Sequence, residues 1–271
     1  MKTEVSEIAD KIYRLSTFMP QIGPNGFTFN QFLIDADQPL LFHYGQRALF
    51  PLISDAVKRV IPLEKLSWTT CSHVEADESG ALNQWLAAAP NATPAHGQIG
   101  CNIWLTDMAD RAPRALKNDD VLDLGAKKVR WLDTPHVPHN WDAGVIYEET
   151  TGTLFCSDLF TQTGPATPTT ESDIVGPAIA VSDRLPYMPP TAMLEPTLRR
   201  LAALKPTTIA LMHGPAFKGD GAAALSALAD HYAKRLHSYA RRLILFAPRS
   251  KPSGCARVVS VSACSASFAP I

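Results

Sequence analysis

The chain has 271 residues, of which 46% are hydrophobic, and its charges nearly cancel to a net −1. This length can bury one large core or two smaller ones, and the balanced charge argues against nucleic acid or a strongly charged protein as a partner. The charged N-terminus and the short, interrupted apolar runs predict neither a secretion signal nor a membrane span, so we expect a cytoplasmic protein.

Short predicted strands and helices alternate along most of the chain. In chain order, we expect strands at 8–16, 27–34 and 40–43, a helix at 49–60, a strand at 66–71, a helix at 81–89, a strand at 129–132, a hairpin of 144–148 with 153–156, an irregular Pro-, Thr- and Ser-rich insertion at 165–190, a helix at 194–204, a strand at 208–211 and a helix at 222–236. This alternation indicates an α/β domain. By itself it is compatible with two packed sheets under outer helices and with a doubly wound sheet.

The composition changes near the C-terminus. Residues 246–271 are rich in Ser, Ala, Pro and Cys and show little periodicity, so we expect a poorly ordered tail after a functional domain at 1–240. The five cysteines are scattered and form no C-x-x-C pair. This pattern argues against a disulfide framework and against a thiolate zinc site.

The segment His73-Val-Glu75-Ala-Asp77-Glu78 carries four titratable side chains within six positions and no basic residue. In an extended segment, His73, Glu75 and Asp77 project to the same side. A bound cation would relieve the repulsion among the carboxylates, and an imidazole with carboxylates suits iron, manganese or zinc. A solvated acidic loop without a metal explains the same segment equally well.

Three further motifs place a ligand-type residue where a predicted strand ends. His136 and His139 lie in a proline-rich loop after a strand, Asp158 ends the strand of Leu-Phe-Cys-Ser-Asp, and His213 precedes Gly-Pro. Taken singly, the aspartate could be a strand-end cap and His213 a buried, hydrogen-bonded histidine. Strand ends on one edge of a sheet converge, so together the motifs predict a common cleft.

In their order, these motifs resemble the metallo-β-lactamase superfamily, and most closely its diiron branch of flavodiiron and oxygen-binding diiron proteins. That branch has H-x-E-x-D where the hydrolases have H-x-H-x-D-H, and the resemblance covers about residues 8–236. It implies a single-domain, four-layer αββα sandwich holding two metal ions, with iron expected and zinc or manganese as alternatives. By position, it implies a metal ligand set of His73, Glu75, Asp77, His139, Asp158 and His213.

Within this set, the resemblance implies that His73, Glu75 and His139 hold one metal, that Asp77 and His213 hold the other, and that Asp158 bridges them. His139 is chosen because an aspartate and a small residue follow it, which leaves His136 as an outer or loop-packing residue. The family usually has a second histidine directly after the aspartate, where this chain has Glu78. Glu78 is therefore either a further ligand or a sign that one metal keeps an open coordination position.

Glu75 stands where the hydrolases have a histidine, and this favours oxygen chemistry over hydrolysis, because an added carboxylate ligand stabilises oxidised iron. We therefore expect an oxygen-binding or oxygen-linked redox protein that takes O₂ or another small molecule. The stretch after Leu236 is too short for a flavin domain, so turnover would need an external electron-donor protein. A two-metal hydrolase of an ester, thioester or lactone is the alternative, and a fold with a damaged site is a third interpretation. The family resemblance also implies a homodimer.

Overall fold

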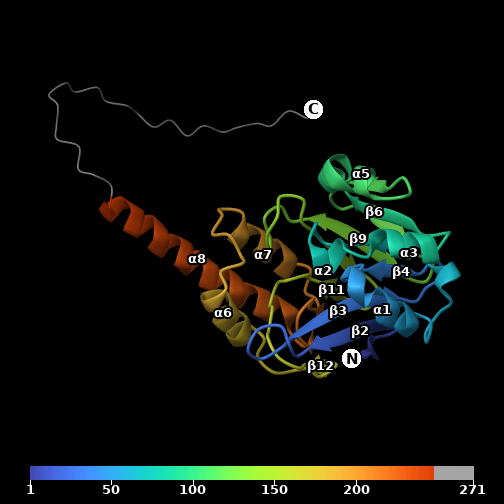
Figure 1. The fold of residues 1–271 in the computed structure, drawn as a ribbon. Helices are drawn as coiled ribbons and strands as arrows, with labels where there is room; N and C mark the ends of the chain where they lie inside the picture. The colour runs from blue at the N-terminus through green and yellow to red at the C-terminus, as the bar shows by residue number, and fades with distance from the viewer. Residues whose placement is uncertain (247–271) are drawn as a thin grey trace.

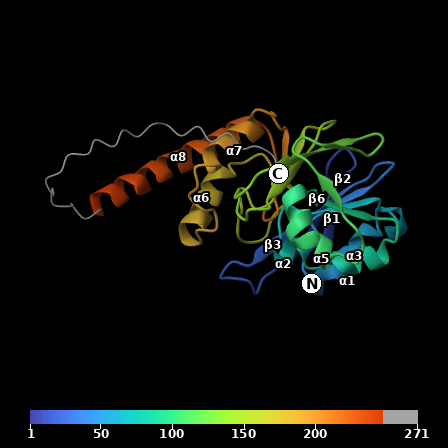
Figure 2. The ribbon, with the colours of Figure 1, turned by 90° about the horizontal axis from the view of Figure 1, so that it is seen from above.

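The computed structural model describes residues 1–246, with their side chains up to residue 236. Two mixed β-sheets pack face to face, and helices cover the outer face of each sheet (Figures 1 and 2). The chain is thus a four-layer αββα sandwich, which confirms two packed sheets under outer helices over a doubly wound sheet.

The first sheet is built from the N-terminal half of the chain. Its strands lie in sequence order: β1 (Thr3–Ala9), β2 (Ile12–Met19), β3 (Phe27–Ile34), β4 (Leu40–Phe42), β5 (Trp68–Thr70), β6 (Thr93–Gly97) and β7 (Arg114–Leu116). Neighbours are antiparallel as far as β4 and parallel from β4 to β7. The parallel strands all end at the same edge, where the segment from His73 to Glu78 begins.

The second sheet comes from the C-terminal half. Its strand order is β12 (Thr169–Thr170), β14 (Ala216–Lys218), β13 (Thr208–Ala210), β11 (Thr153–Phe155), β10 (Gly144–Glu148), β9 (Lys128–Asp133) and β8 (Val121–Asp123). The pair β11–β13 is parallel, whereas β9, β10 and β11 form an antiparallel meander. The Gly144 amide donates to the Ser72 carbonyl at 2.9 Å and joins the two sheets at the edge with the predicted site.

The helices form two separate outer layers. Over the first sheet lie η1 (Arg47–Leu49), α1 (Phe50–Val57), η2 (Leu63–Lys65), α2 (Ala76–Ser79), α3 (Leu82–Ala88), α4 (Gln98–Gly100), the π-helical η3 (Cys101–Leu105) and α5 (Thr106–Met108). Over the second sheet lie α6 (Val175–Arg184), α7 (Leu194–Ala202) and α8 (Gly221–Phe246), the last of which projects beyond the body of the fold (Figure 1). Within residues 1–246 no helix is both long and apolar enough to cross a membrane.

Three apolar clusters hold these layers together. The central cluster lies between the sheets and includes Phe32, Phe42, Trp131 and Phe155, each at most 1% exposed. The second cluster packs α1, α3 and η3 on the first sheet, and the third packs α6, α7 and α8 on the second. Because burying each large apolar side chain contributes ~1.5–3 kcal/mol, these clusters provide a stiff base for the loops at the sheet edge.

Two predicted elements were wrong. Residues 8–16 do not form one strand, because β1 and β2 are a hairpin that turns at Asp10 and Lys11, where Lys11 has φ +53° and its amide donates to Glu7. The stretch 165–190 is not wholly irregular, since it contains β12 and the ten-residue helix α6. The predicted tail at 246–271 lies outside the described residues except for Phe246, the last residue of α8.

Candidate metal centre

All six predicted ligands come from segments that follow strands at one edge of the sandwich. His73 follows β5, and Glu75 and Asp77 lie at the start of α2. The other three come from the second sheet: His139 from the loop after β9, Asp158 after β11 and His213 after β13. The structure brings these side chains, far apart in the sequence, into one cluster.

Four of them form what we call the first position: His73, Glu75, His139 and Asp158. One ligand atom from each lies within 4.8 Å of all the others. Glu75 Oε2 is 3.0 Å from His73 Nε2 and 2.9 Å from His139 Nε2. Asp158 Oδ2 is 3.5 Å and 3.4 Å from the same two nitrogens.

The remaining groups form what we call the second position. His213 Nε2 lies 3.4 Å from Asp77 Oδ2 and 3.1 Å from Asp158 Oδ1. Asp158 therefore directs one carboxylate oxygen toward the first position and the other toward the second. This is the geometry that a carboxylate bridging two cations requires.

The spacing of these atoms fits a metal ion. Ligands about 2.1 Å from a metal, at tetrahedral or octahedral angles, stand about 3.0–3.4 Å apart. The nitrogen–oxygen separations of 2.9–3.5 Å in the two positions match that range. In addition, Asp158 Oδ1 is buried and accepts no hydrogen bond when His213 Nε2, 3.1 Å away, is unprotonated, so a cation between these two atoms would satisfy both.

Comparison with known proteins supports this interpretation of the fold. Residues 27–214 match the family described as the ODP family β-lactamase. The chain belongs to the ODP family. The resemblance to the metallo-β-lactamase superfamily and its diiron branch is thereby confirmed.

Individual curated relatives of this ODP-family chain are named as diflavin flavoproteins and as an oxidase. Diflavin flavoprotein A 1 of Synechocystis sp. is 27% identical over 138 residues, which are 50% of this chain and 24% of the relative. Coenzyme F420H(2) oxidase of Methanothermobacter marburgensis is 27% identical over 145 residues, or 51% of this chain and 35% of the relative. The matched segment thus spans about a quarter to a third of these curated relatives.

Solved structures show the same fold at low identity. The flavodiiron protein from Giardia intestinalis superposes with a TM-score of 0.75 at 16% identity, covering 86% of this chain and 60% of that one. The rubredoxin oxygen:oxidoreductase of Desulfovibrio gigas gives 0.67 at 18% identity, covering 86% and 62%. Both likenesses concern the fold of the ODP-family domain.

Two histidines of the site, His73 and His213, are oriented by hydrogen bonds through their other ring nitrogens. His213 Nδ1 lies 2.9 Å from the Thr28 carbonyl, so that nitrogen carries the proton and Nε2 is left free to bind a metal. His73 Nδ1 lies 3.2 Å from Ser72 Oγ. These contacts prepare the imidazoles before any cation arrives.

The loop that carries His213 is anchored from the opposite sheet. Asn30, buried on β3, donates through Nδ2 to the carbonyls of Leu211 and Gly214 at 2.8 Å each. Arg14, on β2, donates to the Gly214 carbonyl at 3.0 Å. Burial of the Arg14 guanidinium lowers its pKa to about 10, and the negative charge of Glu4 partly opposes this shift.

The loops of His73 and His139 are tied to each other. Asp142 is 4% exposed, and its Oδ2 accepts a hydrogen bond from the Val74 amide at 3.1 Å. Asn140 Nδ2 donates to the Val74 carbonyl at 3.1 Å. Both backbone groups of Val74, which lies between two candidate ligands, are therefore held by the loop of His139.

The carboxylates and imidazoles of the cluster shift one another's pKa values. Burial disfavours protonated His73, but the surrounding carboxylates, foremost Glu78, outweigh burial and raise its pKa to about 10. The same balance, with Asp158 as the main partner, raises the pKa of His213 to about 10. Hydrogen bonds from the imidazoles hold the pKa of Glu75 at about 2. Metal ions would take over the positive charge that protons provide here.

The two remaining candidates lie differently. Glu78 is fully buried behind the cluster, where its Oε2 accepts the Ser72 and His73 amides at 2.9 and 3.0 Å. His136 is exposed in a tight turn closed by its amide and the Asn140 carbonyl. His139 therefore meets the other ligand-type side chains, whereas His136 on the same loop does not.

An apolar cleft of about 270 Å³ opens onto the cluster. Its walls combine the ligand-type side chains with an apolar rim that the sequence did not reveal, made of Ile22, Phe27, Phe29, Leu185 and Tyr187. Phe27 and Phe29 pack against the His213 ring, with centroids 4.5 and 5.2 Å away. Tyr187 donates to the Asp158 carbonyl at 3.1 Å. The sequence alone did not show that Phe27 and Phe29 of β3 line the cleft, because this depends on which edge of the sheet carries the site.

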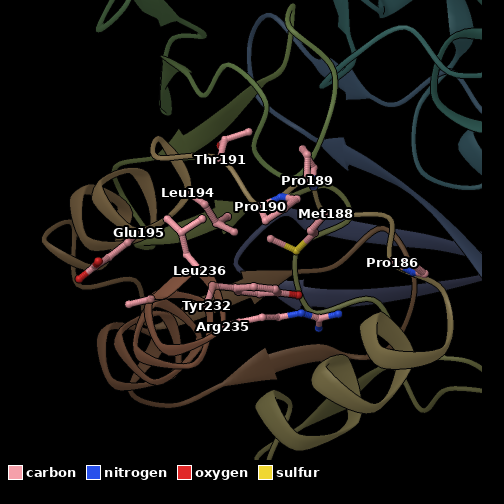
Figure 3. Close-up of a pocket in the computed structure, with 11 residues that line it drawn as sticks. Pro186, Met188, Pro189, Pro190, Thr191, Leu194, Glu195, Tyr232, Arg235 and Leu236 are labelled. Carbon is pink, nitrogen blue, oxygen red and sulfur yellow. The ribbon is translucent and has the colours of Figure 1, made fainter. Parts of the chain in front are cut away.

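The segment that carries Tyr187 is anchored on the helices over the second sheet. Met188 is 5% exposed and packs with Leu194 and Tyr232 around a separate small cavity of about 90 Å³ (Figure 3). No candidate ligand lines this cavity. Its apolar lining serves to hold the neighbouring Tyr187 at the mouth of the cleft.

Proposed function

We propose that the chain binds two iron ions, one in each position, and uses them to bind or reduce dioxygen with electrons from an external donor. The observation that carries this proposal is the carboxylate of Asp158, whose Oδ1 and Oδ2 face different imidazoles in the two positions. A single metal ion would leave one of these oxygens without a cation. Membership of the ODP family supports the same assignment.

The chemistry of the donor set supports iron. The six side chains are three imidazoles and three carboxylates, a set that suits iron, manganese or zinc. Three carboxylates offset most of the charge of two divalent ions and favour their oxidised states. A solved structure of the same fold is named as a flavodiiron protein, and this name makes iron our first choice among these metals.

The cleft supports a small, apolar substrate such as dioxygen. Its rim is apolar, and Tyr187 is held in place by its bond to the Asp158 carbonyl, so the protein limits water beside the cluster. Iron bound here would supply the redox chemistry for binding or reducing dioxygen. The protein's own residues hold the ions, orient the imidazoles and exclude water.

Two relatives carry names that point to oxidases with separate electron donors. One is called a rubredoxin oxygen:oxidoreductase and the other a coenzyme F420H(2) oxidase. By this analogy we propose that the present chain also receives electrons from a separate donor that docks near the cleft. A hydrolase of esters, thioesters or lactones remains the alternative to be separated by experiment, and no feature of the site specifically favours it.

Metal binding is tested with two histidines on one loop. Protein purified without oxygen and supplied with ferrous iron should contain about two irons per chain. His139→Ala should lose iron, whereas His136→Ala, a matched control with an exposed side chain, should retain it. Equal iron content in the two variants would contradict the assignment of His139.

Function is tested by optical spectra and oxygen uptake. The iron-loaded protein should develop a visible band on exposure to dioxygen, and it should consume oxygen when a reduced rubredoxin is supplied. His139→Ala should lose both signals and His136→Ala neither. A protein that instead contains zinc, shows no oxygen-dependent band and hydrolyses an activated ester would support the hydrolase alternative.

A further inference from the structure

The side chain of Glu78 is bound on every side by protein groups. Beyond the amides of Ser72 and His73, its Oε1 accepts a hydrogen bond from Ser157 Oγ at 2.5 Å. His43 Nε2 lies 3.4 Å from the same oxygen, and both His43 and Glu78 are 0% exposed. Glu78 thus links the backbone at His73 to Ser157, the residue that directly precedes Asp158.

These bonds direct the carboxylate away from the cleft. Glu75 and Asp77 line the cleft, but Glu78 does not. The side chain would have to leave two backbone amides without a partner in order to turn toward a metal. Leaving buried donors unsatisfied carries a large penalty, so the inward orientation is strongly preferred.

The two positions consequently have unequal protein ligands. The first position is surrounded by two imidazoles and two carboxylates, all within 4.8 Å of one another. The second has His213, Asp77 and the remaining oxygen of Asp158. With one fewer protein ligand, an ion there must complete its coordination with water or another small molecule.

We propose that Glu78 holds the ligand loops from behind instead of binding metal, and that the second position therefore binds its ion more weakly than the first and keeps a coordination site open to the cleft. This inference rests on the proposed function. It assigns a positioning role to Glu78 and an order of loading to the two positions.

The order of loading is tested by titrating the metal-free full chain with ferrous iron under anaerobic conditions. Isothermal titration calorimetry measures the heat of each binding step. Two binding steps should appear, with affinities at least tenfold apart. Asp77→Asn should remove the weaker step, and His139→Ala should weaken the tighter one. Two ions bound with equal affinity would overturn the inference while leaving a dinuclear site intact, and an absence of iron binding would instead overturn the proposed function.

The role of Glu78 is tested by two substitutions in the same titration. Glu78→Gln keeps one oxygen to accept both backbone amides and an amide group to donate to Ser157, so both steps should stay within about threefold of wild type. Glu78→Ala should weaken the tighter step more than tenfold, because His73 loses its backbone support. A tenfold or greater loss of the weaker step alone in Glu78→Gln would identify Glu78 as a ligand and overturn the proposal. Circular dichroism checks that each variant is folded, and the Gln variant decides the matter if the Ala variant is not.

Discussion

Trp104 donates a hydrogen bond from its indole Nε1 to Asp142 Oδ2 at 2.8 Å. The same carboxylate oxygen accepts the Val74 amide, so the π-helical segment of the outer layer is joined to both ligand loops. The bond is buried, and its acceptor is an aspartate, which makes it stronger than a bond between neutral groups.

Trp104→Phe should therefore loosen the first position. Loss of a hydrogen bond to a charged group should lower the free energy of unfolding by about 1.5–3 kcal/mol and speed the release of metal to a chelator. Trp68→Phe is a matched control, since its indole donates to the exposed Gln38 side chain at 3.2 Å. The control should release metal at the wild-type rate. Equal release rates in the two variants would show that the Trp104 bond does not support the site.

Asn30→Asp should disrupt the loop of His213. The buried Asn30 amide donates to the carbonyls of Leu211 and Gly214. The substitution replaces it with a carboxylate oxygen, which repels both carbonyl oxygens. We expect a loss of about 3 kcal/mol or more in urea unfolding. Asn25→Asp, at an exposed amide that donates to Thr163, should change stability by less than about 0.5 kcal/mol. A loss below about 1 kcal/mol for Asn30→Asp would argue against the anchoring role.

Tyr187→Phe should affect metal binding beyond its effect on stability. It removes the hydroxyl that donates to the Asp158 carbonyl, and Tyr147→Phe removes a comparable bond to the Leu204 carbonyl at 3.2 Å, away from the cleft. Each variant should lose about 0.5–1.5 kcal/mol of unfolding free energy. Only Tyr187→Phe should release metal faster, because Asp158 contributes to both positions. If chelator assays give the same rate for both variants, Tyr187 acts on the fold alone.

Glu148 should make stability depend on acid pH. Burial raises the pKa of this carboxyl, but hydrogen bonds from Thr151 and Thr150 outweigh burial and lower the pKa below its usual value. A lowered pKa in the folded state stabilises the protein above the unfolded-state pKa of about 4.3, and that contribution is lost as the pH falls toward the folded-state pKa.

Glu148→Gln should thus cost about 1–3 kcal/mol at pH 7, and the difference from wild type should shrink below about pH 4. Urea unfolding at both pH values measures this change. Glu149→Gln is the control: its carboxylate pairs with Arg130 near the surface, and its loss should cost at most about 1 kcal/mol. A Glu148→Gln penalty that does not vary with pH would contradict the assignment.

Much of the candidate site could be predicted from the sequence because its residues follow strands. A ligand-type residue after a short apolar segment is visible in the sequence, and parallel or adjacent strands bring such positions to one edge, as seen for Asp158 and His213. The choice between His136 and His139 needed the family resemblance, because both histidines share one loop. The alternation of strands and helices indicated the α/β class but could not choose between the two architectures.

Other features depend on contacts between distant segments. Glu78 is oriented by the Ser72 and His73 amides together with Ser157, which is 79 positions away, so its own motif could reveal only part of its surroundings. His96 lies buried on β6 against Trp104 and Trp131, in a part of the chain where the sequence predicted no strand. The helix α6 was hidden in a Pro- and Thr-rich stretch, where packing of Ala178 in the apolar cluster over the second sheet overrides composition.

The six candidate ligands divide equally between the halves of the chain. Three come from the segment after β5 in the first sheet, and three follow strands of the second. A pair of bound ions would thus cross-link the two sheets of the sandwich. Because the unfolded chain cannot present this arrangement, iron at a hundred times its dissociation constant would add about 2.7 kcal/mol to the stability of the whole molecule. The supply of iron would then affect the stability of the folded protein as well as its chemistry.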